Sequence, residues 1–402
     1  MAGRKSSWAD DLSVLRHEPV LWALVAMTLV CAVISFVSLR ALGAVLPISL
    51  AFTLLIYTVQ TRSFPAPPRA LLSVFCVFVF LVGLAAIRSL DFDYALGRFF
   101  KLTMTALIAV LFWGLARHIP TLSTLKNALL LSCLIGLCWG LVEGVSDGAV
   151  YAMRRGVSLG EAAYSSNRAM VVLALLVWPA ALITSQRYGA AAGLGLVAFL
   201  FVVAMTGESQ AAQLSVFVSM GVLGSALMVP RATLWGAAVL GCFFIMSMPL
   251  LISQLGLVSL GEGVPHAEFT ILPRMEIWLY VSQKILAQPL LGYGLEAGRF
   301  LPLDDMTQVY FTDVHLHHPH NGVLQIWFEM GVLGALALAT AWALLLRQAS
   351  FLSEKDVPFV LAGLCCALIV GSVAHGVWQS WWVGALALLP FFYAVACAKA
   401  SE

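Results

Sequence analysis

Charged residues are scarce in this sequence. Of its 402 residues only 10% are Asp, Glu, Lys or Arg, and 61% are hydrophobic, whereas about 25% of the residues in soluble domains are charged. This composition excludes a water-soluble globule. The 22 Lys and Arg against 20 Asp and Glu leave a net charge of +2, which is too small for a nucleic-acid-binding surface. The sequence therefore indicates a protein whose solvent is the lipid bilayer, with no nucleic-acid partner.

Motifs for several chemistries are also missing. No glycine-rich phosphate loop occurs, so we do not expect cytoplasmic ATP to drive this protein. No Asp-rich pair resembles a divalent-metal site, and we expect neither a metal ion nor a cofactor. The eight cysteines lie within apolar stretches, and none forms a C-x-x-C motif. Free, buried thiols are therefore expected at Cys31, Cys76, Cys133, Cys138, Cys242, Cys365, Cys366 and Cys397.

Apolar stretches of membrane-spanning length dominate the chain. Backbone polar groups must be paired internally in hydrocarbon, so a run of about 20 apolar residues predicts a spanning helix. Twelve such stretches cover residues 20–38, 43–59, 70–87, 99–116, 127–144, 168–184, 189–206, 211–229, 233–252, 322–346, 358–376 and 379–397. We predict an all-α polytopic membrane protein with about 12 transmembrane helices, forming one integral membrane domain over residues 1–402.

The basic residues indicate the orientation of these spans. Arg4, Lys5 and Arg16 precede the first stretch, and no small-residue cleavage site follows it, so we expect a cytoplasmic N-terminus that is not a signal peptide. Twelve spans would return the C-terminus to the cytoplasm. The only long polar connection, residues 253–321, then lies on the outer face between the ninth and tenth spans. We expect function to reside there.

Three arginines gather in the outer loop before the sixth span. Arg154, Arg155 and Arg168 lie within fifteen residues, with Asn167 beside the last of them. Because guanidinium groups bind phosphate oxygens through two parallel hydrogen bonds, the segment indicates an anion site. Interfacial arginines that bind lipid headgroups are the alternative.

The outer connection contains a second arginine motif. Arg274 begins a segment with a rough helical stripe of apolar residues, which predicts an amphipathic helix at the interface. Backbone N–H groups at the start of such a helix also favour an anion. A purely structural role for Arg274 is the alternative. The segment is followed by Pro-Leu-Leu-Gly-Tyr-Gly, which contains Tyr293.

Four of the eight histidines lie within residues 315–320. Clustered imidazoles can bind zinc or nickel, although Pro319 restricts the geometry and no cysteine accompanies them. One histidine could instead act as a general base, because imidazole titrates near neutrality. A solvated loop without a role is the third reading.

Carboxylates also lie in or near the outer ends of the spans. They are Glu143, Glu161, Glu208 and Glu329. Ion pairs with the arginines and catalytic roles are both open for them.

The spacing after the last histidine resembles a known family. His320-Asn321, nine residues, Gly331, two residues and Gly334 match the fixed positions of the H-[NSQ]-x9-G-x-x-G motif of bacterial O-antigen ligases. Arg274 and the Pro-Leu-Leu-Gly-Tyr-Gly segment resemble the signature that precedes this histidine in the O-antigen ligase and polymerase superfamily. One position departs from the pattern. Gln210 stands where the superfamily commonly has an arginine after a serine, so Arg154, Arg155 or Arg168 would supply that charge.

The resemblance implies a fold and an activity. The fold would be that of a GT-C-type glycosyltransferase in the bacterial inner membrane, with its active site facing the periplasm. The activity would be transfer of O-antigen from undecaprenyl diphosphate to lipid A-core, with inversion at the anomeric carbon. His320 would be the general base, and Arg274 would neutralise the leaving diphosphate in place of a metal ion. The expected substrate-binding residues are Arg154, Arg155, Arg168, Asn167, Asn321, His318 and Tyr293, with Asn321 also expected to cap the tenth span or orient His320.

Three other functions remain open. An O-antigen polymerase would use the same donor, and a protein O-oligosaccharyltransferase would modify a Ser or Thr of a protein. The complete motif and compact length favour the ligase. A secondary transporter is a different class, since twelve spans and intramembrane charges are common there. No inverted repeat is evident, and the polar residues gather on one face, which disfavours transport.

Overall fold

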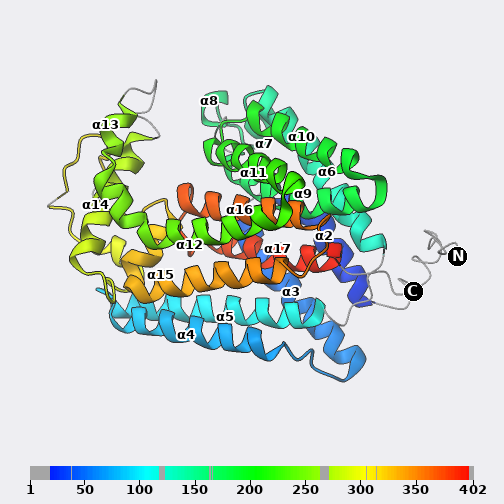
Figure 1. Cartoon of the computed structure of the whole chain (residues 1–402), viewed down its shortest axis with the longest axis horizontal. Coiled ribbons are helices and arrows are strands. Elements are labelled where there is room, and N and C mark those ends of the chain that lie inside the picture. Colours follow the sequence, from blue (N-terminus) through cyan, green and yellow to red (C-terminus); the bar gives the residue numbers. More distant parts are fainter. Residues whose placement is uncertain are drawn as a thin grey trace, which may run out of the picture.

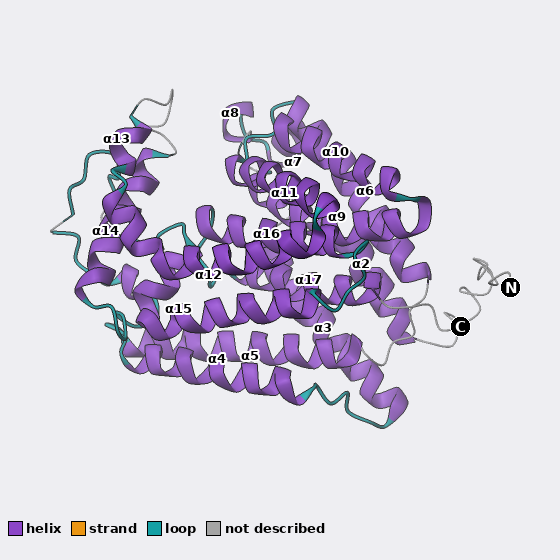
Figure 2. Ribbon diagram, in the orientation of Figure 1, coloured by secondary structure: helices purple, strands orange, loops and turns teal. Residues whose placement is uncertain are grey.

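The computed structural model describes residues 19–37, 39–116, 123–162, 164, 166–262, 271–304, 306–313 and 315–397. Within these residues every regular element is a helix (Figure 2), which confirms the all-α prediction. The helices are α2 (Pro19–Val37), α3 (Leu39–Thr61), α4 (Arg69–Ile87), α5 (Phe92–Ala116), α6 (Ser123–Val145), α7 (Ala149–Arg155), α8 (Leu159–Ala162), α9 (Asn167–Tyr188), α10 (Ala190–Thr206), α11 (Gln210–Met228), α12 (Pro230–Gln254), α13 (Leu257–Gly261), α14 (Leu272–Ala287), η2 (Ala297–Arg299), α15 (Gly322–Ala349), α16 (Val357–Val373) and α17 (Ser380–Cys397).

Each of the twelve predicted stretches coincides with one of these helices. Among the described residues, eight helices are long and apolar enough to cross a membrane. The other four stretches correspond to shorter apolar helices within α2, α3, α10 and α16. The chain is therefore a multi-pass membrane protein, while crossing by all twelve helices stays a prediction.

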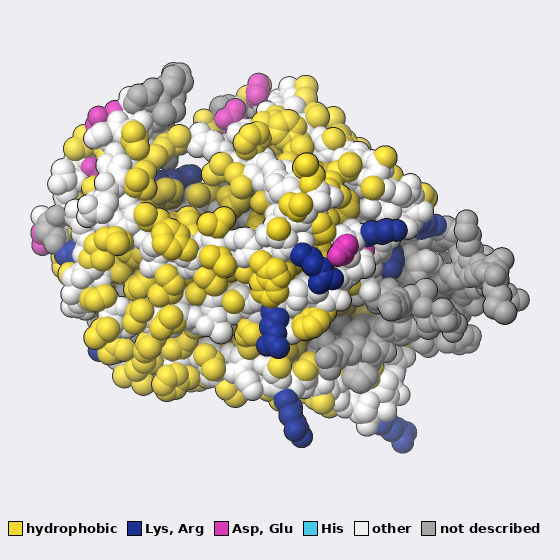
Figure 3. All heavy atoms as spheres, viewed as in Figure 1, with side chains coloured by type: hydrophobic (Ala, Val, Ile, Leu, Met, Phe, Trp, Pro, Cys, Tyr) yellow, Lys and Arg dark blue, Asp and Glu magenta, His cyan; other side chains and the backbone are white. Residues whose placement is uncertain are grey.

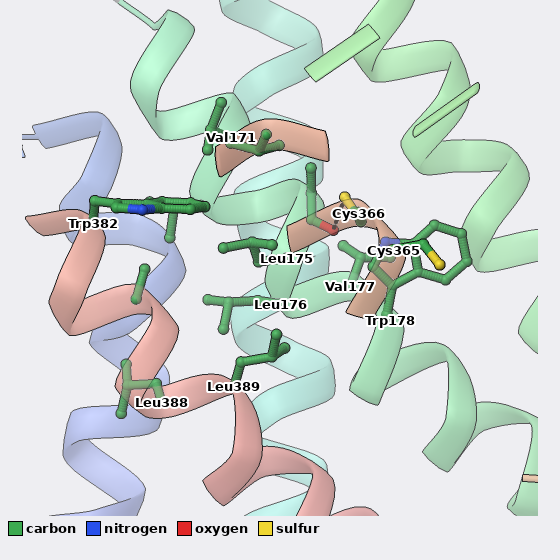
Figure 4. Close-up of a cluster of buried hydrophobic side chains, with 14 of the residues drawn as sticks. Val171, Leu175, Leu176, Val177, Trp178, Cys365, Cys366, Trp382, Leu388 and Leu389 are labelled. Carbon is green, nitrogen blue, oxygen red and sulfur yellow. Dashed lines mark hydrogen bonds between the residues drawn. The ribbon is translucent and has the colours of Figure 1, made fainter. Parts of the chain in front are cut away.

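Helix α9 is the centre of the bundle. It packs against α2, α6, α10, α11, α16 and α17, and its side chains are buried on every face from Ala169 to Ile183. A helix that is apolar all round is expected in such a position. Figure 4 shows its Leu175 and Leu176 facing Trp382 and Leu389 of α17. This packing fixes the start of α9, where Arg168 lies.

The peripheral helices expose large apolar side chains. Phe80 of α4, Phe100 of α5 and Phe243 of α12 are 67%, 61% and 61% exposed. Figure 3 shows hydrophobic side chains spread over this part of the surface. Such a surface is stable when lipid tails cover it. Two cysteines belong to it, since Cys76 and Cys138 are exposed, so the prediction of buried thiols is wrong for these two.

Contacts between helix termini divide the bundle into two ends. We call residues 85–98, 167–168, 292–299, 315–325 and 374–380 the histidine end, and residues 123–127, 186–188, 230–231, 353–357 and 396–397 the opposite end. Hydrogen bonds join the termini within each end: Ser89 to Leu295, Arg98 to Glu296 and His320 to Ala374 at the first, and Lys126 to Ala396, Gln186 to Asp356 and Arg231 to Glu354 at the second. An alternating path of the predicted spans places the termini in these same two groups. Helix α14 lies at the histidine end, at the left of Figure 1.

Candidate active site

Four segments converge at the histidine end. They are the start of α9 with Arg168, the start of α14 with Arg274, the loop 315–321, and the connection 374–379 between α16 and α17. Figure 3 shows a hollow between the side formed by α13 and α14 and the side formed by α7, α8 and α11, with Lys or Arg atoms inside it. Residues far apart in the sequence therefore share one polar site.

The backbone of His320 has an uncommon conformation. Its φ is +53°, in the left-handed region that few residues other than glycine adopt. The neighbours on both sides hold it there. Trp278 of α14 donates its indole N–H to the carbonyl of Pro319 at 2.8 Å. Asn321 caps α15, accepting the backbone N–H of Leu324 at 3.0 Å, which confirms the predicted capping role. Because Asn321 is fully buried, its contacts favour positioning over substrate binding.

Hydrogen bonding fixes the tautomer of His320. Its Nδ1 lies 3.2 Å from the carbonyl oxygen of Ala374. A carbonyl can only accept, so Nδ1 carries the proton and Nε2 is the basic nitrogen. Burial lowers the pKa of His320, as do the charges of Arg274 and Arg168, against an opposing effect of the Ala374 hydrogen bond. His320 is therefore neutral at pH 7, as a general base must be.

His318 is held in a different way. Its ring lies edge-on to that of His320, with centroids 4.3 Å apart. Trp381 donates to the amide oxygen of Gln379 at 2.9 Å, which turns the amide nitrogen toward His318 Nε2 at 3.0 Å. Burial, followed by the charges of its neighbours, lowers the pKa of His318 to about 3. A ring with so low a pKa is a weak base near neutral pH, which disfavours His318 as a second base. Its predicted substrate contact stays a prediction.

Two of the predicted arginines act on these histidines. The charges of Arg274 and Arg168 both lower the pKa of His320, so both lie in its surroundings. Arg274 is the third residue of α14, after Pro273, which confirms that it starts a helix. In the part of the chain that the structure describes, no ion pair joins either arginine to a carboxylate. Guanidinium groups without acidic partners are chemically suited to bind an anion, and that role stays a prediction for both arginines.

The start of α9 also contacts the segment that departs from the superfamily pattern. Ser209 donates its hydroxyl to the carbonyl of Asn167 at 3.1 Å. Gln210 follows Ser209, so Arg168 lies next to the position where the superfamily's arginine is missing. Asn167 has a buried side-chain oxygen without a hydrogen-bond partner among the described residues. That oxygen can accept a substrate hydroxyl, and its use stays a prediction.

The other two predicted arginines have different surroundings. Arg154 donates to the carbonyls of Phe36 and Val37 at the end of α2, at 3.3 and 2.7 Å. Arg155 is exposed and lies 6.0 Å from the ring centroid of Tyr151. The contacts of Arg154 favour a structural role, and substrate binding by Arg155 stays a prediction.

The two glycine motifs form one structural unit. Gly331 breaks α15, with φ 63° and ψ −154°. The carbonyls of Phe328 and Glu329, just before the break, accept the N–H groups of Tyr293 at 2.8 Å and Gly294 at 3.0 Å. A Cβ at Gly331 would collide with the backbone of Leu290. Only glycine can therefore admit the loop 289–294 to the helix.

Two residues of this unit have local contacts. The ring of Tyr293 stacks on Phe328 at 5.0 Å and its hydroxyl donates to the carbonyl of Lys284 at 3.2 Å, so its contacts hold the loop, and its predicted substrate contact stays a prediction. A Cβ at Gly334 would meet Met330 and Ile326 of its own helix. Gly334 thus accommodates the break in α15, whereas Gly331 makes a close approach to a neighbouring segment.

Within the described part of the chain, no ion pair joins Glu143, Glu208 or Glu329 to an arginine. Glu143 accepts the indole N–H of Trp139 at 3.1 Å, and Glu329 accepts that of Trp378 at 2.6 Å. Glu208 is exposed, and the side chain of Glu161 lies outside the described residues. The ion pairs at the histidine end involve Glu296 instead, which binds Arg98 and Arg299.

His375 is a residue that sequence reasoning missed. Its ring packs edge-on against Trp381 at 4.6 Å, and its buried Nε2 has no hydrogen-bond partner among the described residues. Burial, then the charges of Arg168, His320, Arg274 and His318, lower the pKa of His375 to about 3. The available signal was an ionisable residue at the end of an apolar stretch.

The metal reading of the histidine cluster gains no support. His315 and His317 are exposed, and His317 Nδ1 lies 3.3 Å from Arg299. The described residues contain no group of three or more His, Cys, Asp or Glu side chains that could hold a metal ion.

Comparisons with known proteins agree with this geometry. The family model described as O-antigen ligase matches residues 172–339, a range that includes Arg274, His320 and the glycine unit. A Rickettsia typhi protein named "Putative polysaccharide ligase" is 25% identical over 70% of this chain and 71% of its own length. Its namesake in Rickettsia prowazekii has the same identity and coverage, and one in Rickettsia conorii is 29% identical over 34% of each chain. These matches support the resemblance of the chain to the O-antigen ligase superfamily.

Proposed function

We propose that this protein is an O-antigen ligase. It transfers O-antigen polysaccharide from undecaprenyl diphosphate to a sugar hydroxyl of lipid A-core, without a metal ion. The observation that carries the proposal is a neutral His320, with Nε2 as its basic nitrogen, in the surroundings of two arginines that lack acidic partners. The match to the O-antigen ligase family model and the ligase names of the relatives support a ligase-type enzyme.

The reaction follows from these roles. The acceptor hydroxyl oxygen attacks the anomeric carbon while His320 Nε2 takes its proton. The bond from that carbon to the diphosphate breaks, and the diphosphate keeps the electron pair. Arg274 and Arg168 neutralise the charge that develops on the leaving group, as a divalent cation does in other glycosyltransferases. A single displacement of this kind inverts the configuration at the anomeric carbon.

The location of the protein follows from its substrates. Both donor and acceptor carry lipid tails, so the site must open to the bilayer. We place the protein in the bacterial inner membrane, with the histidine end facing the periplasm and residues 253–321 as the periplasmic region that carries the motifs. The exposed apolar surface of α4, α5 and α12 supports membrane insertion, and the grouping of helix termini supports a single active face.

Deletion of the gene in its host tests the proposal. Lipopolysaccharide and lipid-linked glycans are separated on gels before and after deletion. A ligase predicts loss of the long-chain ladder while polymer accumulates on undecaprenyl diphosphate. Core carrying a single repeat unit, with no lipid-linked polymer, would indicate a polymerase. Unchanged patterns in both pools would favour a protein O-oligosaccharyltransferase or a transporter.

A further inference from the structure

A polar stripe runs along the first turns of α15. Asn321, Gln325 and Glu329 follow one another at intervals of four residues, so they lie on one face of the helix. All three are nearly inaccessible, with exposed fractions of 0%, 2% and 2%. Asn321 serves as the cap of the helix. The other two residues have no role in the proposed reaction, although burial of a carboxylate is unfavourable without several hydrogen bonds.

Both residues bind the connection 374–379. The backbone N–H of Val377 donates to the side-chain oxygen of Gln325 at 2.8 Å, and the indole N–H of Trp378 donates to Glu329 at 2.6 Å. The amide nitrogen of Gln325 donates to the other oxygen of Glu329 at 2.7 Å. These three bonds orient one another, since each oxygen of Glu329 receives a different donor. They attach the connection 374–379 to the first turns of α15, which follow the Asn321 cap.

The same connection supports both histidines. At one end the carbonyl of Ala374 accepts the Nδ1 proton of His320, and at the other Gln379 donates to His318. Its position therefore decides whether His320 Nε2 remains the basic nitrogen. The family match ends at residue 339, so it covers Gln325 and Glu329 but not the connection that they hold.

We propose that Glu329, together with Gln325 and Trp378, forms a positioning network that sets the tautomer and orientation of His320 through the connection 374–379. This inference rests on the proposed function, because it assigns the network a part in proton transfer. It differs from a purely structural role in one respect: breaking the network changes the acid–base behaviour of His320 in a protein that still folds.

The acid–base change has a definite sign. The groups that act on His320 are Arg274 of α14, Arg168 of α9, His318 of its own loop and the Ala374 carbonyl of the connection; His375 lies next to that carbonyl. The hydrogen bond to Ala374 raises the pKa of His320, whereas burial and the two arginines lower it. Loss of that bond leaves only the lowering effects. The pH at which transfer activity falls on acidification then moves down, while the maximal rate drops because the base is misplaced.

Two tryptophans provide a matched test. Trp378 and Trp382 are both nearly buried, with 7% and 2% exposure. Only Trp378 donates to Glu329, and Trp382 has no indole hydrogen bond among the described residues. Trp378→Phe and Trp382→Phe therefore remove similar bulk, but only the first breaks the network. Glu329→Gln is the second probe, because its amide nitrogen would face one of the two N–H donors.

The variants are compared in nanodiscs, using undecaprenyl-diphosphate-linked glycan and lipid A-core, with kcat and KM measured across pH. We expect Trp378→Phe and Glu329→Gln to lose about 10- to 100-fold in kcat, as a misplaced catalytic group does. KM should stay close to that of the unmodified protein, and the acidic fall in rate should shift to lower pH. Trp382→Phe should keep kcat and the pH profile.

The outcomes separate the two proposals. Equal effects of the two tryptophan substitutions, or a lower yield of folded protein with unchanged kcat and pH profile in the folded fraction, would overturn the positioning network while the ligase activity stands. If the unmodified protein transfers no glycan between these substrates, the proposed function fails, and the network fails with it.

Discussion

Basic residues are used differently at the two ends of the bundle. Three basic residues of the opposite end have protein partners: Arg231 pairs with Glu354 at 3.0 Å, Arg187 donates to Asn127 at 2.6 Å, and Lys126 donates to the carbonyl of Ala396 at 3.3 Å. At the histidine end, Arg98 and Arg299 share Glu296. Arg168 and Arg274, in the surroundings of His320, have no carboxylate partner among the residues that the structure describes.

The difference shows where a ligand is needed. Folding alone gives no reason to keep two cations without acidic partners in the surroundings of His320, whose protonated form both of them repel. An anionic substrate would balance both charges. The paired cations of the opposite end fasten helices together, whereas the unpaired ones are available for a diphosphate.

Replacing the base should have the largest effect. We expect His320→Ala to lower the transfer rate by about 10²- to 10⁴-fold, the usual contribution of a general base, in a protein that still inserts and folds. His315→Ala is the matched control, because His315 is an exposed member of the same loop. The transfer rates of both variants are measured in nanodiscs. Normal transfer by His320→Ala would refute the assignment of His320 as the base.

Replacing an arginine that lacks an acidic partner should have the next largest effect on the transfer rate. We expect Arg274→Ala to lower transfer by about 100-fold, and Arg274→Lys to recover only part of it, because an ammonium group cannot form the two parallel hydrogen bonds of a guanidinium. The same change at the opposite end, Arg231→Ala, breaks an exposed ion pair and should leave transfer unchanged. Equal activity of the three variants would remove the diphosphate role of Arg274.

The arginine of α9 permits a rescue experiment. Arg168→Ala should lower transfer by about tenfold, the effect of losing one charge-assisted contact. Because Ser209 contacts the residue before Arg168, an arginine at position 210 would enter the site from nearby. The double variant Arg168→Ala, Gln210→Arg should therefore regain activity, and Gln210→Arg alone serves as the control. No gain in the double variant would mean that the two positions do not share one phosphate contact.

The helices and the main site residues could be predicted from the sequence, because apolar length and motif spacing are local signals. Every predicted stretch coincides with a helix, and Arg274 begins α14 as expected. Convergence across distant segments was not predictable. No feature of the nearby sequence identifies Ala374 as the hydrogen-bond partner of His320. None predicts that the N–H of Tyr293 bonds to the carbonyl of Phe328, just before the break at Gly331. The contacts of Arg154 were not predictable for the same reason, since its partners at the end of α2 are more than one hundred residues away.

A smaller effect is expected on the pH dependence of transfer, through the arginines in the surroundings of His320. An ordinary histidine is half protonated at about pH 6.5, and the pKa of His320 is lowered, first by burial and also by Arg274 and Arg168. A base works in its neutral form, so the midpoint of the fall in rate on acidification should lie below pH 6.5. Arg274→Gln removes one lowering charge and should move this fall to higher pH. Arg231→Gln should not move it, and a shift common to both variants would contradict the local origin of the effect.

Removal of metal ions should have no effect at all. The positive charge that a divalent cation supplies to a leaving diphosphate is here assigned to Arg168 and Arg274, and the described residues contain no group of three or more His, Cys, Asp or Glu side chains that could hold a metal ion. Purified protein treated with EDTA should therefore keep its full transfer rate. Inactivation that added zinc reverses would instead assign a metal to the histidine loop, and the arginines would then need another explanation for their lack of acidic partners.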